Sequence, residues 1–126
     1  MATVTFSYDL DFLDGVDALD VLPQDVKTEI LTTPTKLVAN YQIADINGGN
    51  FSAAPGFTAD FGVFVKNLST TTNLNVLFRL PSMANTQTIT LAPGEAIKLN
   101  KVQNAIGCFI QTVSGTARFF SAFWGT

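Results

Sequence analysis

The residues best suited to chemistry are five aspartates near the start of the chain. They recur every two or three residues, at Asp9, Asp11, Asp14, Asp17 and Asp20. Clustered carboxylates supply the oxygen ligands that Ca²⁺ prefers. A helix–loop–helix calcium loop beginning at position 9 needs an oxygen ligand at 13, glycine at 14 and glutamate at 20. The sequence has Leu, Asp and Asp there, so two interpretations stay open: a structural calcium site, or a solvated acidic strip.

Apolar residues are interleaved with these aspartates, as expected for an amphipathic strip. A spacing of three drifts around a helix, and Gly15 weakens a helix further, so residues 9–22 predict a loop with one loose helical turn. The apolar side of this strip is a candidate interface with another subunit. Its residues are Leu10, Leu13 and Val16.

Other catalytic and cofactor motifs are missing from the sequence. The chain has no histidine, which excludes imidazole-based triads and histidine-bearing zinc sites. Its one cysteine, Cys108, has no partner for an internal disulfide and lies in an apolar segment typical of a small core residue. Scattered acids are a weak signal for glycoside hydrolysis. We therefore expect no enzyme activity and no cofactor.

The composition favours assembly with other subunits. Only 13% of the residues are charged while 47% are apolar, against roughly 25% charged in an ordinary soluble domain. Either neighbouring subunits cover part of the surface, or this is a weakly charged monomer. No run approaches the roughly 18 apolar residues of a membrane-spanning helix, and the start shows no signal-peptide pattern. We expect neither membrane insertion nor secretion.

Charge is divided unevenly along the chain. Residues 1–29 hold seven acids and one lysine, giving −6, and residues 30–126 hold three acids, four lysines and two arginines, giving +3. An acidic segment therefore precedes a mildly basic body, a pairing that attracts within a subunit or between neighbours. The basic residues form no cluster, so we expect no nucleic-acid binding.

Alternation of apolar and polar residues predicts an all-β body. Pro23, followed by Val26, Ile30 and Leu31, predicts one short helix over 23–31 before it. We expect an acidic N-terminal arm over 1–35 and a single antiparallel β-sandwich, jelly-roll-like, over 36–126, with seven or eight strands. The expected strands cover 3–6, 36–46, 57–67, 74–80, 105–113 and 116–124, plus the two strands of a hairpin over 86–99.

That hairpin surrounds the clearest turn in the sequence, Ala92-Pro93-Gly94-Glu95. Proline at the second position fixes φ near −65°, and glycine at the third permits φ > 0. The turn is therefore expected to be type II.

The last strand is apolar on both faces. Ala117, Phe119, Ser121 and Phe123 alternate with Arg118, Phe120, Ala122 and Trp124. A sheet in an isolated sandwich usually has a solvated outer face. Either another part of the chain covers the second face, or it is a subunit interface, for which aromatic residues are favoured. Four aromatic residues of this strand are candidate interface residues: Phe119, Phe120, Phe123 and Trp124.

Residues 57–126 resemble small β-sandwich structural proteins of bacteriophage virions. The resemblance is carried by the Leu-Ala-Pro-Gly-Glu turn, the Ser-Gly-Thr-Ala entry to the last strand and the aromatic strand itself. It implies a capsid decoration (cement) or vertex protein that forms homo-oligomers, contacts a major capsid or other virion protein, and assembles in the cytoplasm of the bacterial host. The alternative is a receptor- or carbohydrate-binding module of a phage fibre or tail, with Tyr41, Phe51 or Trp124 stacking on sugar rings.

Overall fold

The computed structural model describes residues 4–8, 11–14, 17–20, 27–31, 36–51, 56–105 and 107–126. The chain divides into two compact units, Met1–Pro34 and Thr35–Thr126. The described residues of both units are all-β and antiparallel. None of them belongs to a helix of the length and apolarity needed to cross a membrane.

The first unit contains two antiparallel strand pairs. β1 (Val4–Tyr8) pairs with β4 (Lys27–Leu31), and β2 (Asp11–Asp14) pairs with β3 (Asp17–Asp20). Among the described residues, the two strands of each pair are hydrogen-bonded only to each other. We call these four strands the acidic ribbon.

Two expectations for this unit are wrong. Residues 11–14 and 17–20 are paired strands, although a loop with a helical turn was expected. Residues 27–31 are a strand, although the sequence predicted a helix over 23–31, and residues 23–26 lie outside the described part. The apolar spacing of a segment this short fits either structure, and pairing with β1 decides the outcome.

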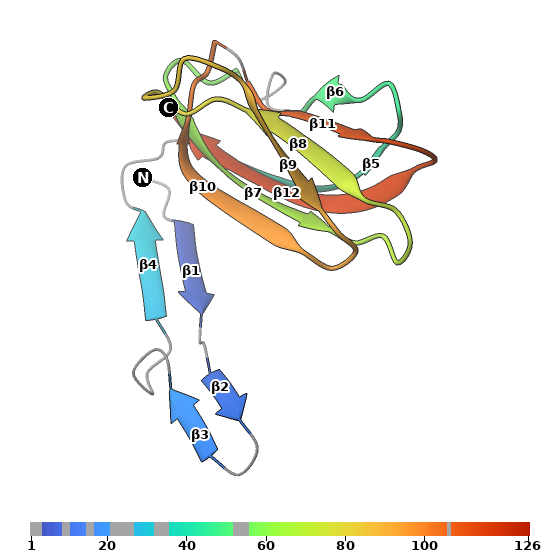
Figure 1. Cartoon of the computed structure of the whole chain (residues 1–126). Helices are drawn as coiled ribbons and strands as arrows, with labels where there is room; N and C mark the ends of the chain where they lie inside the picture. Colours follow the sequence, from blue (N-terminus) through green and yellow to red (C-terminus); the bar gives the residue numbers. More distant parts are fainter. Residues whose placement is uncertain are drawn as a thin grey trace. The chain divides into compact units, whose positions relative to one another are not determined.

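The second unit contains two four-stranded sheets that appear as two layers in Figure 1. The first sheet has the order β10-β7-β12-β5, formed by Ala96–Val102, Phe61–Asn67, Ala117–Gly125 and Lys36–Ala44. The second has the order β6-β11-β8-β9, formed by Gly49–Asn50, Phe109–Thr112, Leu74–Phe78 and Gln87–Leu91.

One hydrophobic core lies between the two sheets and contains side chains from both. Alternation produces this core, because every second residue of a strand points to the same face. Val63 and Val65 of the first sheet and Leu74 and Val76 of the second are each fully buried. The strand expected over 57–67 begins only at Phe61; Phe57 is buried outside the strand and stacks on the Phe61 ring at 4.9 Å.

The turn at 92–95 has the expected geometry but a different role. Gly94 has φ of 85°, and the Glu95 amide donates to the Ala92 carbonyl at 3.0 Å. The strands on either side do not pair with each other: β9 pairs with β8, and β10 pairs with β7. The expected hairpin is therefore wrong, and the turn carries the chain from one sheet to the other.

A buried asparagine holds this crossing in place. The Asn67 side-chain amide donates to the carbonyls of Thr72 and Leu91 at 2.8 and 2.9 Å, and its oxygen accepts from the Ser69 amide. Its backbone carbonyl also accepts from the Gly94 amide at 3.0 Å. Asn67 thus ties the end of β7 to the end of β9 in the opposite sheet.

Candidate functional site

The two faces of β12 differ in burial. Ala117, Phe119, Ser121 and Phe123 are all buried and belong to the inner face, while Arg118 is exposed on the outer face. The expectation that Phe119 and Phe123 contribute to an interface is therefore corrected. Both rings are within the core, where they cannot reach a partner without unfolding of the body.

Aromatic rings line the outer face of the first sheet across three neighbouring strands. Tyr41 of β5 lies opposite Phe120 of β12, with ring centroids 5.1 Å apart, and Phe64 of β7 lies 6.2 Å from Phe120 on the other side. The Arg118 guanidinium sits 5.0 Å from the centre of the Tyr41 ring. We call this surface of β5, β12 and β7 the aromatic face.

Exposure on the aromatic face increases toward β5. Phe64 and Phe120 are half-buried, whereas Leu37, Tyr41 and Ile43 of β5 are 48%, 65% and 67% exposed. β5 is an edge strand, and no other described strand pairs with its second side. The aromatic face therefore ends in three exposed apolar side chains beside an open row of backbone hydrogen-bonding groups.

The apolar residues that alternate along β5 lie on its outer face, away from the core. In register with β12, the inward positions of β5 are mixed: the half-buried Val38 and the buried Ala44 flank Asn40, opposite Ser121, and Gln42, opposite Phe119. The outward positions are Leu37, Ala39, Tyr41 and Ile43. The more apolar face of β5 is thus the outer one, which the sequence analysis did not predict. Alternation shows that a strand has an apolar and a polar face, but it does not show which face lies inside.

Trp124, expected at an interface, is only 3% exposed. A Cβ at Gly62 of β7 would lie 2.1 Å from the Trp124 Cε2 atom, so the indole occupies the space above this glycine. Trp124 supports the aromatic face from the end of β12 and presents little surface of its own. Phe120, half-buried, remains the one residue of the expected aromatic set with accessible area.

Of the three other expected site residues, Leu13 alone lies in a strand of the acidic ribbon. This strand is β2, and Leu10 and Val16 lie outside the described residues. The β2–β3 register places Asp11 opposite Asp20 and Asp14 opposite Asp17. No group of acidic, histidine or cysteine residues suited to a metal was found where the structure describes side chains, and the two interpretations of residues 9–20, a calcium site or a solvated acidic strip, both stay open.

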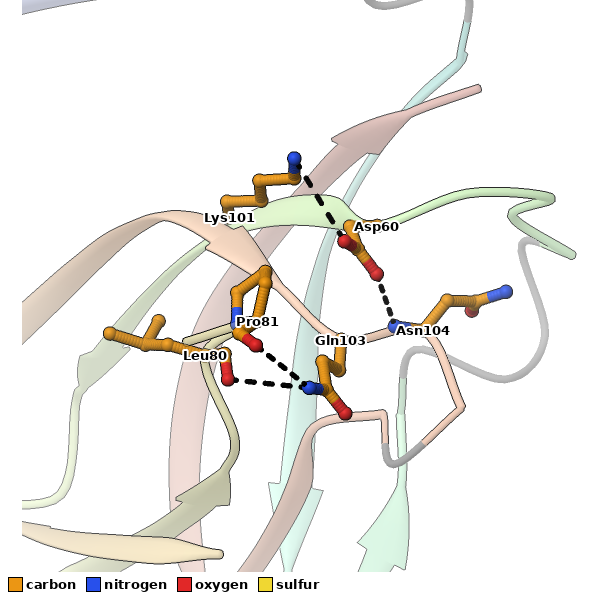
Figure 2. Close-up of polar contacts among 6 residues, drawn as sticks. All are labelled: Asp60, Leu80, Pro81, Lys101, Gln103 and Asn104. Atoms are coloured by element: carbon orange, nitrogen blue, oxygen red, sulfur yellow. Dashed lines mark hydrogen bonds and ion pairs between the residues drawn. The ribbon is translucent and has the colours of Figure 1, made fainter. Parts of the chain in front are cut away.

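A hollow of about 530 Å³ lies at one end of the body, lined by residues 80–82 and 98–101. Figure 2 shows the polar contacts beside it. The Asp60 carboxylate accepts from the Asn104 amide at 3.2 Å and lies 4.0 Å from the Lys101 ammonium. Gln103 donates to the Leu80 and Pro81 carbonyls at 3.5 and 3.4 Å. These contacts join the loops of the two sheets and leave no paired carboxylates for acid–base chemistry.

The other two carboxylates of the body also hold turns. Asp45 Oδ1 accepts from the Asn47 and Gly48 amides, and Glu95 Oε2 accepts from the Ala92 amide at 2.8 Å. Burial raises the pKa of the Cys108 thiol to about 12, so it stays protonated and unreactive at neutral pH. The three carboxylates of the body thus hold turns and loops, and its one thiol is buried.

The remaining aromatic candidates differ in accessibility. Phe51 is half-buried and packs edge-to-face on Phe119, with ring centroids 5.0 Å apart. Only Tyr41 has most of its surface free. In comparisons with known proteins, no family model, curated protein or solved structure gave a significant match.

Proposed function

We propose that this protein is a structural subunit of a bacteriophage virion, a capsid decoration (cement) or vertex protein that acts through protein–protein contacts. It forms homo-oligomers, contacts a major capsid or other virion protein and assembles in the cytoplasm of the host bacterium. It is not an enzyme and uses no cofactor. The observation that carries the proposal is β5, which places Leu37, Tyr41 and Ile43 outside the core.

An outward apolar strand is explained by a partner that covers it. Transfer of one such side chain from water into an interface contributes about 2 kcal/mol. Three of them on each subunit, beside the half-buried Phe64 and Phe120, supply an interface that needs no catalytic group. Repetition around a shell or vertex multiplies this contribution.

The strand order of the body supports the same proposal. Two sheets with the orders β10-β7-β12-β5 and β6-β11-β8-β9 have the connectivity of an eight-stranded jelly roll. Viral capsid proteins and lectins are frequent users of this fold. The resemblance of residues 57–126 to small phage virion proteins, together with the 13% of charged residues, favours the capsid role.

Sedimentation velocity of the purified chain tests the proposed assembly. We expect a discrete oligomer. Tyr41→Lys with Ile43→Lys should weaken association at least 100-fold, because two apolar contacts of about 2 kcal/mol each are replaced by charges. The control is Thr86→Lys with Thr88→Lys, which adds the same charge at exposed positions just before and within β9 of the other sheet and should leave association unchanged.

Purified phage particles test the virion role. Mass spectrometry should find the protein in a fixed ratio to the major shell protein, and the Tyr41 and Ile43 double variant should be lost from the particles. A wild-type chain that stays monomeric and is absent from particles would contradict the proposal.

The second candidate is a carbohydrate-binding module of a phage fibre, and the exposed Tyr41 ring is the observation that favours it. Tyrosine rings stack on sugars, and lectins also use the jelly roll. A glycan array separates the two functions. A monomer that binds one glycan class and loses that binding in Tyr41→Ala would support the fibre module over the shell subunit.

A further inference from the structure

The sheet that carries the aromatic face also carries most of the positive charge of the body. Its four strands contain Lys36, Lys66, Lys98, Lys101 and Arg118, and none of them contains an acidic residue. The strands of the other sheet contain no charged residue. A partner for the aromatic face should therefore be acidic as well as apolar.

The acidic ribbon of the same chain has this chemistry. Residues 1–29 hold seven acids and one lysine, giving −6. The β2–β3 register sets Asp11 opposite Asp20 and Asp14 opposite Asp17, and like charges at opposed positions destabilise a strand pair. A two-stranded ribbon is also marginal in water without a third strand or a packed face. The ribbon thus needs what the aromatic face offers: positive charge, apolar surface and an open strand edge.

We propose that the aromatic face and the free edge of β5 receive the acidic ribbon of a second copy of this chain. Lys66 and Arg118 offset the paired aspartates, and the apolar residues of β5 are covered by the ribbon. This inference rests on the proposed homo-oligomer and names the contact that builds it. Because each subunit contributes one ribbon and one face, the contact can close as a two-fold exchange of ribbons between two subunits, or repeat head to tail as a ring or an open filament.

A charge exchange in the full-length protein tests the contact. The first variant reverses the face, with Lys66→Glu and Arg118→Glu. The second reverses the ribbon, with Asp14→Lys and Asp17→Lys. The third combines all four changes and has the net charge of the wild type. Sedimentation velocity at 50 mM NaCl should show association weakened at least tenfold in each two-site variant and restored to within threefold of the wild type in the four-site variant.

A control tests whether the position of the new acids matters. The ribbon-reversed variant combined with Thr86→Glu and Thr88→Glu carries its new acids on the other sheet, so it should not recover association. If the face-reversed variant fails to fold, Lys66→Gln with Arg118→Gln replaces it and should also weaken association. In the wild type, raising NaCl from 50 to 500 mM should weaken association, because ion pairs near the surface are screened.

The outcomes distinguish this inference from the proposed function. An oligomer that withstands both reversals and high salt overturns the ribbon contact but leaves the proposed assembly intact. Failure of the four-site variant to recover also overturns the contact. A wild-type chain that stays monomeric, including one whose own ribbon covers its own face, overturns both the contact and the homo-oligomer.

Discussion

The two sheets of the body share one core, yet their outer faces are opposite in character. On the β6-β11-β8-β9 sheet, the outward positions include Thr88, Thr90 and Asn75, and the Thr90 hydroxyl donates to the Asn75 side chain at 2.8 Å. On the other sheet, the outward positions of β5 are Leu37, Tyr41 and Ile43. Three of the six exposed large hydrophobic residues in the described part belong to β5, and none belongs to the four strands of the second sheet.

This contrast shows how a chain with few charges keeps one surface solvated and leaves another for assembly. Threonine, asparagine and glutamine hydrate the outer face of the second sheet without charge, beside the half-buried Leu77 and Phe109. The strand charges of the body are gathered on the first sheet, beside its exposed apolar residues. The charged fraction of the whole chain therefore hides a difference between the two sheets: the strands of one carry no charge, and the strands of the other carry several.

The largest loss of stability is expected at Asn67, which ties the two sheets together. Without this tie the two sheets could not keep their different outer faces. Asn67→Ala removes three side-chain hydrogen bonds, a buried one to the Leu91 carbonyl and two partly buried ones with the Thr72 carbonyl and the Ser69 amide. We expect the free energy of unfolding to fall by about 3 kcal/mol. Urea unfolding followed by Trp124 fluorescence measures it.

The matched control is Asn75→Ala on the outer face of the second sheet. Asn75 is half-buried and accepts one hydrogen bond from Thr90, so its loss should lower stability by less than about 1 kcal/mol. Equal losses in the two variants would show that Asn67 is not the tie between the sheets.

A second prediction compares the stability loss caused by replacing one glycine with alanine in each sheet. Gly62→Ala places a Cβ 2.1 Å from Trp124 Cε2, so the indole must move. We expect a loss of about 2 kcal/mol and a red shift of the Trp124 emission. Gly49→Ala in β6 meets only the Phe51 ring, at 3.4 Å, and should lower stability by less than about 1 kcal/mol. Unchanged emission in Gly62→Ala would contradict the placement of Trp124.

The smallest changes in stability are expected for two buried hydroxyl groups, one on the inner face of each sheet. Removing one should raise stability, and removing the other should lower it. The Ser121 hydroxyl of β12 is buried and has no hydrogen-bond partner among the described residues, so Ser121→Ala should raise stability by up to about 1 kcal/mol. The Thr112 hydroxyl of β11 donates to the Gly115 carbonyl at 2.7 Å, so Thr112→Val should lower it by about 1 kcal/mol. Thermal unfolding measures both, and a destabilised Ser121→Ala would indicate a partner for that hydroxyl.

Local chemistry predicted many of the elements of the body from the sequence. Alternation located β5, β8 and β12, and Pro93-Gly94 located the turn with its positive φ. Which strands pair could not be predicted in the same way. The turn at 92–95 looks like a hairpin turn because its own residues specify the bend, whereas the partners of β9 and β10 are specified by residues distant in sequence.

The candidate site was predicted only in part for the same reason. Phe120 was expected on an outer surface from the two apolar faces of its strand, and it lies there. Its neighbours Tyr41 and Phe64 come from strands separated from it by more than fifty residues, so no local pattern joins the three. Phe119 and Phe123 were assigned to an interface because they are aromatic. They lie on the side of β12 that faces the core, and both are buried.

The pairing of β5 with β12 also sets the order of events during synthesis. These strands are the first and the last of the body, and their register joins Lys36 to Gly125. A ribosome releases β5 long before β12, so β5 waits without its partner while the chain between them is made. The β8–β9 pair, formed by consecutive strands, has no such delay. The sheet with the aromatic face is therefore completed only after β12 has left the ribosome, later than the β8–β9 pair of the other sheet.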